Sequence, residues 1–141
     1  MIIKFEKMNE NAVEPLIAHI GDAGADLTAC EVLSKTQNRI VYDTGIAVEI
    51  PAGNVGLIFP RSSIRKYDLI LSNSVGVIDS SYRGSIQVTF NKIESLFPKL
   101  YEVGDKIAQL IIVPIAIVNY VISDDLSDTL RGHSGHGSTG K

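Results

Sequence analysis

The side chains best suited to chemistry gather in five short segments, each marked by glycine or proline and rich in polar groups. They combine carboxylates, hydroxyls and arginines with glycine-rich backbone, and such groups bind anions and transfer protons. Taken singly, each segment also has a plain structural interpretation, since aspartates cap turns and an arginine can be a surface charge. The segments are 22–28 (DAGADLT), 60–63 (PRSS), 73–84 (NSVGVIDSSYRG), 104–110 (GDKIAQL) and 131–140 (RGHSGHGSTG).

The sequence gives less support to a metal-binding cluster or to a catalytic nucleophile. The histidines are His19, His133 and His136, and the lone cysteine, Cys30, has no partner at a zinc-binding spacing. The sequence contains neither a nucleophile-elbow pattern nor the Walker phosphate-binding pattern. The five polar segments therefore remain the candidates for a functional site.

The last segment differs in kind from the others. From Arg131 onward glycine and serine dominate, so this tail cannot bury enough apolar surface to order itself. One interpretation is a flexible chain end. The other is a lid, in which glycines let backbone N–H groups converge on an anion while Arg131, Ser138 and Thr139 add further donors.

The elements that must position these segments are predicted to be strands. Short apolar runs alternate with turn residues, which favours a β-sandwich or barrel. Only two short helices are predicted, near 62–67 and 91–96. The predicted strands lie at 2–5, 39–50 with a turn at 43–45, 55–59, 69–71 and 86–90.

The apolar stretch 110–122 does not alternate with polar residues. A strand with this pattern is expected to be buried on both faces. The second face could be covered by another subunit or by the other sheet of a sandwich, and the sequence leaves both open.

Composition sets the wider limits. With 141 residues, 45% hydrophobic and 21% charged, the chain is expected to form one globular domain. The net charge of −3 disfavours non-specific nucleic-acid binding. A single cysteine, no apolar leader and no stretch long enough to cross a bilayer indicate a cytoplasmic protein without a membrane partner.

Taken together and in order, the five segments resemble the five motifs of the trimeric dUTPase family over 22–140. The resemblance implies a distorted jelly-roll β-sandwich that forms a homotrimer, with a β domain over 1–130 and a C-terminal arm over 131–141. It implies hydrolysis of dUTP to dUMP and pyrophosphate, which limits uracil in DNA and supplies dUMP for dTMP synthesis. Mg²⁺ would be held by the substrate phosphates, with no direct protein ligand.

The resemblance also implies the roles of individual residues. Asp79 would deprotonate the water that attacks the α-phosphorus, and Asp26 would support the metal region indirectly. Asn73 and the backbone near Val77 and Ile78 would bind the uracil edge, and the ring of Tyr82 would exclude a 2′-hydroxyl. The other predicted substrate-binding residues are Arg61, Ser62, Ser63, Gln109, Arg131, His136, Gly137, Ser138 and Thr139.

Two positions depart from the usual family pattern. Ser63 stands where many members have glycine, a tolerable variant. His136 stands where an aromatic ring, usually phenylalanine, stacks on the uracil. Imidazole is smaller and gains a proton near neutral pH, so we expect a higher KM than in a His136→Phe variant.

Two other functions compete with dUTP hydrolysis. The related dCTP deaminases need a glutamate on the strand after the Gly-x-Ile-Asp turn, but Thr89 stands there and its neighbours include no glutamate. The second rival is a nucleotide-dependent binding module that regulates a protein partner. The complete set of expected residues favours catalysis, although a regulatory role could accompany it; the set is Asp79, Tyr82, Arg131, Ser138 and Thr139.

Overall fold

Strands account for nearly all regular structure in residues 1–135, the part of the chain that the computed structural model describes. The one helix there, the 3-10 helix η1 (Ser62–Lys66), is short, and no helix in this part is long and apolar enough to cross a membrane. The strands are β1 (Lys4–Lys7), β2 (Ala25–Thr28), β3 (Glu31–Lys35), β4 (Arg39–Asp43), β5 (Ile46–Glu49), β6 (Asn54–Pro60), β7 (Leu69–Leu71), β8 (Gly76–Ile78), β9 (Gln87–Lys92) and β10 (Lys106–Pro114).

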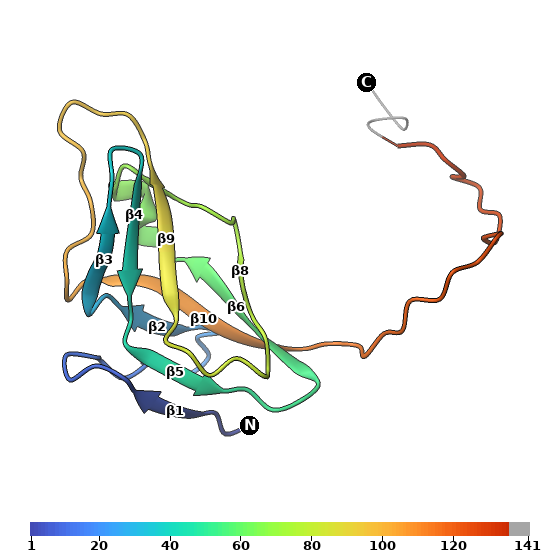
Figure 1. Cartoon of the computed structure of the whole chain (residues 1–141), viewed down its shortest axis with the longest axis horizontal. Helices are drawn as coiled ribbons and strands as arrows, with labels where there is room; N and C mark the ends of the chain where they lie inside the picture. Colours follow the sequence, from blue (N-terminus) through green and yellow to red (C-terminus); the bar gives the residue numbers. More distant parts are fainter. Residues whose placement is uncertain (136–141) are drawn as a thin grey trace.

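The strands form two four-stranded sheets and one two-stranded sheet, all antiparallel (Figure 1). One large sheet has the order β2-β10-β6-β8, the other has the order β3-β4-β9-β7, and β1 pairs with β5. Ile58 and Leu110 from the first sheet share one core cluster with Ile40, Val88 and Phe90 from the second. The molecule is therefore a β-sandwich, as the sequence predicted.

Three aromatic residues organise the core beside the second sheet. Tyr42 and Phe90 are fully buried and meet edge to face, with ring centroids 6.1 Å apart. The Tyr42 hydroxyl donates a 2.7 Å hydrogen bond to the Tyr101 carbonyl, which satisfies a polar group inside the core. Burial raises the pKa of Tyr42 to about 12, so this hydroxyl keeps its proton at neutral pH.

Several sequence-based boundaries need correction. The predicted helix at 91–96 is wrong, because β9 runs to Lys92 and the residues that follow form an irregular loop. The helix near 62–67 is confirmed as η1, and the turn at 43–45 separates β4 from β5. Strands β2 and β8 lie inside the polar segments 22–28 and 73–84 and have only four and three residues, so neither was predicted as a strand.

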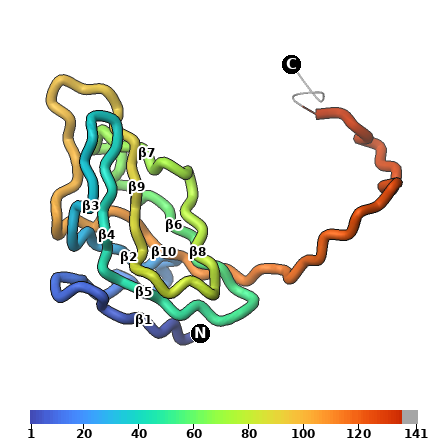
Figure 2. Tube along the Cα trace, viewed as in Figure 1, coloured from blue at the N-terminus to red at the C-terminus, as the bar shows by residue number. Residues whose placement is uncertain are grey.

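The segment after β10 also differs from the prediction. The strand ends at Pro114, and the following residues lead away from the sandwich (Figure 2). Leu110 is buried, but Ile117, Tyr120 and Ile122 are 88%, 95% and 96% exposed. The prediction that 110–122 is buried on both faces is therefore wrong for the residues after Pro114 in the single chain. We refer to residues 115–135 as the C-terminal segment.

Candidate functional site

Three of the polar segments meet because β10 lies between β2 and β6. In the register of this sheet Gln109 lies opposite both Asp26 of β2 and Phe59 of β6, and Arg61 follows directly after β6. The segments border a pocket of about 340 Å³. Its lining residues are Ala18, His19, Asp22, Ala23, Gly24, Asp26, Arg61, Ser62 and Gln109.

Asp26 anchors the charges of this pocket. Its side chain is 12% exposed and forms ion pairs with Arg61 Nε at 2.6 Å and Lys106 Nζ at 3.0 Å. Burial alone would raise the pKa of Asp26, but hydrogen bonds and positive charge from Lys106 and Arg61 outweigh it and lower the pKa below 3.8. The carboxylate is thus ionised at neutral pH and holds the Arg61 guanidinium in place.

Gln109, which pairs with Asp26 in the sheet, also lines the pocket and is fixed by a hydrogen bond. Its Nε2 donates a 3.1 Å hydrogen bond to the Pro60 carbonyl. Its Oε1 lies so close to Gly24 that a Cβ atom at that position would come within 2.7 Å of it. Gly24 therefore provides room for the amide. Ser62 is exposed and Ser63 is half-buried, both in η1.

A directly bound metal does not fit the pocket. Among residues 1–135 no group of three His, Cys, Asp or Glu side chains could hold an ion. Both Asp26 oxygens already accept hydrogen bonds from Arg61, and Asp22 Oδ2 accepts one from the His19 N–H at 3.0 Å. The pocket instead presents cationic and amide donors, which suit an anionic ligand.

A second group of predicted residues surrounds β8, at the edge of the same sheet. Asn73 lies in the turn that crosses from β7 to β8, where Ser74 has a φ of 60° and thus a strained left-handed conformation. Val77 is 62% exposed, Ile78 is half-buried and Asp79 is exposed. As an edge strand, β8 presents main-chain donors and acceptors on its outer side.

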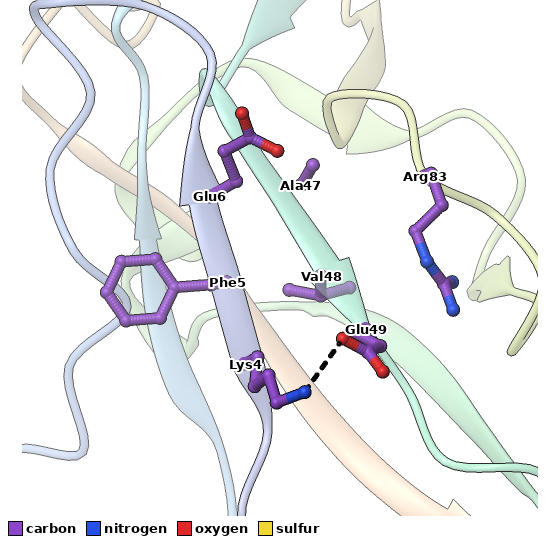
Figure 3. Close-up of a pocket in the computed structure, with 7 residues that line it drawn as sticks. All are labelled: Lys4, Phe5, Glu6, Ala47, Val48, Glu49 and Arg83. Atoms are coloured by element: carbon purple, nitrogen blue, oxygen red, sulfur yellow. Dashed lines mark hydrogen bonds and ion pairs between the residues drawn. The ribbon is translucent and has the colours of Figure 1, made fainter.

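The turn after β8 shapes the surroundings of Tyr82. The Tyr82 N–H donates to the Asp79 carbonyl at 3.0 Å, and the residue is 42% exposed. Arg83 Nη1 donates to the carbonyls of Ser80 and Tyr82 at 2.7 and 2.8 Å. Figure 3 shows the Arg83 side chain extending beside β5, in a pocket that β1 also lines. Arg83 thus braces its own turn.

The two groups do not meet within one chain. On β6, Gly56 pairs with Ile78 and Ile58 with Gly76, so Asp79 lies beyond Gly56, away from Arg61. Continuing this register places Asp79 beside Val55. Val55 and Arg61 are six residues apart, or ~20 Å along the strand. A single chain therefore presents a phosphate-type pocket and a separate β8 edge.

The last group of predicted residues lies near the C-terminus. Arg131 is exposed on the C-terminal segment, and its Nε donates to the Ser134 carbonyl at 3.0 Å. Within the described residues it is therefore not brought to either group. His136, Gly137, Ser138 and Thr139 lie outside the described residues.

Sequence reasoning missed two residues at the pocket. His19 lines it, and Lys106 binds Asp26. Lys106 stands inside the segment 104–110, so its position beside Gln109 was the available clue. Nothing in the sequence pattern marks His19, which lies before the first segment on an irregular stretch.

The fold and the two residue groups define an all-β protein with an anion pocket and a polar strand edge. Comparison with known proteins is consistent with this class. A dUTPase family model matches residues 10–140. The deoxyuridine 5'-triphosphate nucleotidohydrolase of Corynebacterium glutamicum is 39% identical over 141 residues, covering 99% of this chain and 95% of that protein. The chain therefore belongs to the dUTPase family, a family of dUTP diphosphatases.

Solved structures agree with this assignment. The dUTPase of Staphylococcus phage 80alpha, determined with dUPNHPP, superposes with a TM-score of 0.83 at 29% identity and covers 99% of both chains. A mutant dUTPase of the Staphylococcus aureus phage phi11, described with a structural Mg(II) ion, gives a TM-score of 0.76 at 27% identity. That comparison covers 91% of this chain and 100% of the phage protein.

Proposed function

We propose that this protein hydrolyses dUTP to dUMP and pyrophosphate by attack of water on the α-phosphorus. The observation that carries the proposal is the pocket in which Asp26 orients Arg61 beside Ser62 and Gln109. This donor set suits a triphosphate, and family membership supplies the nucleotide. In the cell, the reaction would limit uracil in DNA and supply dUMP.

Asp79 is the proposed base. Its exposed carboxylate follows the last residue of β8, where a bound water could be held in line with the phosphorus. Asn73 offers both a donor and an acceptor to the uracil edge, and the outer edge of β8 adds main-chain groups at Val77 and Ile78. The Tyr82 ring would occupy the space that a 2′-hydroxyl needs.

Mg²⁺ is the proposed cofactor, held through the substrate phosphates and water near Asp26. When bound, it would neutralise phosphate charge. The protein's own share is to orient the phosphates: the Arg61 guanidinium and the Ser62 and Ser63 hydroxyls donate to phosphate oxygens, and Gln109 closes the far side. Arg131, Ser138 and Thr139 would add donors from the arm, with His136 over the base.

We further propose a homotrimer in which each active site combines residues of different subunits. Two observations support it. The pocket at Arg61 and the edge at Asp79 lie ~20 Å apart along β6, too far for one nucleotide to use both in a single chain. The C-terminal segment exposes Ile117, Tyr120 and Ile122, which suits burial against another copy.

The test follows pyrophosphate and ammonia release from dUTP, dCTP, dTTP and UTP, each with Mg²⁺. We expect pyrophosphate from dUTP alone, and its loss in Asp79→Asn, which keeps the shape but not the charge. Glu94→Gln, the same type of change on an exposed loop, serves as control. Ammonia from dCTP would contradict the proposal. Measurable dUTP binding without turnover would favour the binding module instead.

A further inference from the structure

Tyr82 is positioned in part by a hydrogen bond from its hydroxyl. The residue is 42% exposed, so packing encloses its side chain only in part. Its hydroxyl donates a 3.0 Å hydrogen bond to the Ser85 carbonyl three residues later. The ring lies over Gly84, where a Cβ atom would come within 2.6 Å of the ring carbon that bears the hydroxyl. The position of the ring therefore depends on where Ser85 lies.

Ser85 is in turn hydrogen-bonded to the sheet that contains β4 and β9. Its hydroxyl donates to Oδ1 of Asp43, the last residue of β4. The same Oδ1 accepts the Gly45 N–H at 3.0 Å, and the Asp43 carbonyl accepts the Cys30 N–H at 2.8 Å. Asp43 is thus fixed by backbone groups on two sides. Its hydrogen bond to Ser85 therefore also restricts the position of Ser85.

The turn between β4 and β5 also holds the residue that follows Ser85. Thr44 is fully buried, and both its N–H and its hydroxyl donate to the Ile86 carbonyl, at 3.1 and 2.8 Å. The Ile86 N–H donates to the Ile46 carbonyl at 2.8 Å. Residues 85 and 86 are therefore held by one turn, none of whose residues lines the Arg61 pocket.

We propose that Asp43 and Ser85 are positioning residues that set the preference for a deoxyribose over a ribose by fixing Tyr82. This inference rests on the proposed function, in which the Tyr82 ring excludes a 2′-hydroxyl. Such exclusion is steric, so a ring that can retreat admits the larger sugar. A displacement of about 1 Å is enough to change a rate strongly in a well-fitted site.

The experiment compares wild type with Ser85→Ala, Asp43→Ala and the double variant. The first readout is the ratio of kcat/KM for dUTP to that for UTP. The second is the ratio of the Kd values of the α,β-imido analogues of UTP and dUTP, which does not require turnover. Each single variant should lower both ratios about three- to tenfold. The main reason is that UTP and its analogue should bind more tightly to the variant than to the wild type.

Two comparisons separate positioning from general damage. Ser85→Thr keeps the hydroxyl and should retain the wild-type ratios, whereas Ser95→Ala makes the same deletion on an exposed loop and should change nothing. The double variant should match the more affected single variant, because both residues act through one chain of bonds. In a Tyr82→Phe background, Ser85→Ala should have a smaller effect, because the bond to the Ser85 carbonyl is already lost.

The outcomes distinguish this inference from the proposed function. Hydrolysis of dUTP with ratios unchanged by Ser85→Ala would overturn the positioning role and leave the activity intact. Absence of dUTP hydrolysis would count against the proposed function, and the binding ratios would still decide on Asp43 and Ser85. A wild-type protein that binds both sugars equally would also overturn the inference.

Discussion

At the scale of single residues, Asp26 decides what the pocket can bind. Two cations, Arg61 and Lys106, share its carboxylate, so the positive charge nearest the pocket is fixed in direction. A freely rotating arginine would lose side-chain entropy on binding a phosphate, whereas this one is already ordered. An acidic protein can thereby bind a polyanion at a local cationic site.

Asp26→Asn should lower the free energy of unfolding by about 1–3 kcal/mol at pH 7, because Arg61 and Lys106 lose their counter-charge. The pKa of Asp26 is lowered in the folded protein, so its stabilising effect is complete above 3.8 and disappears as the pH falls through the lower folded value. The difference between wild type and variant should therefore shrink in strong acid. Urea unfolding from pH 7 to pH 2 measures it.

The control is Asp124→Asn, the same change at an exposed carboxylate. It should alter the free energy of unfolding by less than about 0.5 kcal/mol. A constant difference between wild type and Asp26→Asn at every pH would mean that the carboxylate's charge contributes nothing.

Residue types alone led to the family, but not to the contacts. The segments around Asp26, Arg61 and Gln109 were recognisable because their order and spacing form a pattern. The pairing of Asp26 with Lys106 depends on a β-bulge between Lys106 and Ala108, which no local pattern announces. The separation of Arg61 from Asp79 follows from strand register and could not be foreseen from spacing.

At the scale of elements, β6 is central to the first sheet and packs closely against its neighbours. Gly56 of β6 lies where a Cβ atom would come within 2.8 Å of Ile50 Cδ1 and 3.0 Å of Leu110 Cδ1. The absence of a side chain at Gly56 thus lets these strands and the core approach each other. A short apolar run predicted β6 well, but β2 and β8 have only four and three residues and lie within polar segments, so neither forms a recognisable apolar run.

Gly56→Ala should therefore destabilise the fold by about 1–3 kcal/mol through overpacking. Adding Ile50→Val, which removes Cδ1, should recover part of that loss. Urea unfolding of both variants measures the effect, with Gly135→Ala, where nothing lies within 4 Å, as the matched control. Equal stability of Gly56→Ala and wild type would show that the Ile50 and Leu110 side chains can move aside without loss of stability.

At the scale of the whole molecule, each chain keeps the Arg61 pocket and the β8 edge apart. Arg61 borders the pocket, Asp79 follows β8, and β6 spans the distance between them. In the proposed homotrimer these are the two halves of one site. If subunits combine their halves, then one defective half per chain need not inactivate an oligomer. Mixing variants thus tests how the site is assembled.

Arg61→Ala and Asp79→Asn should each be inactive alone. When the two are unfolded together and refolded as a mixture, we expect pyrophosphate release from dUTP at about a quarter of the wild-type rate, because random trimers pair an intact Arg61 with an intact Asp79 at one site in four. Refolding each variant separately provides the control. No recovery in trimers shown by native mass spectrometry to be mixed would place both residues in the same chain's site.

The position of the C-terminal segment in the sequence has a consequence for biosynthesis. All ten strands of residues 1–135 precede it, ending at Pro114, so the ribosome makes every one of them before it makes Ile117 or Tyr120. The residues proposed to contact a sibling chain are thus the last part of the described chain to be synthesised. Contacts between sibling chains through this segment can form only after every strand of the sandwich has been made.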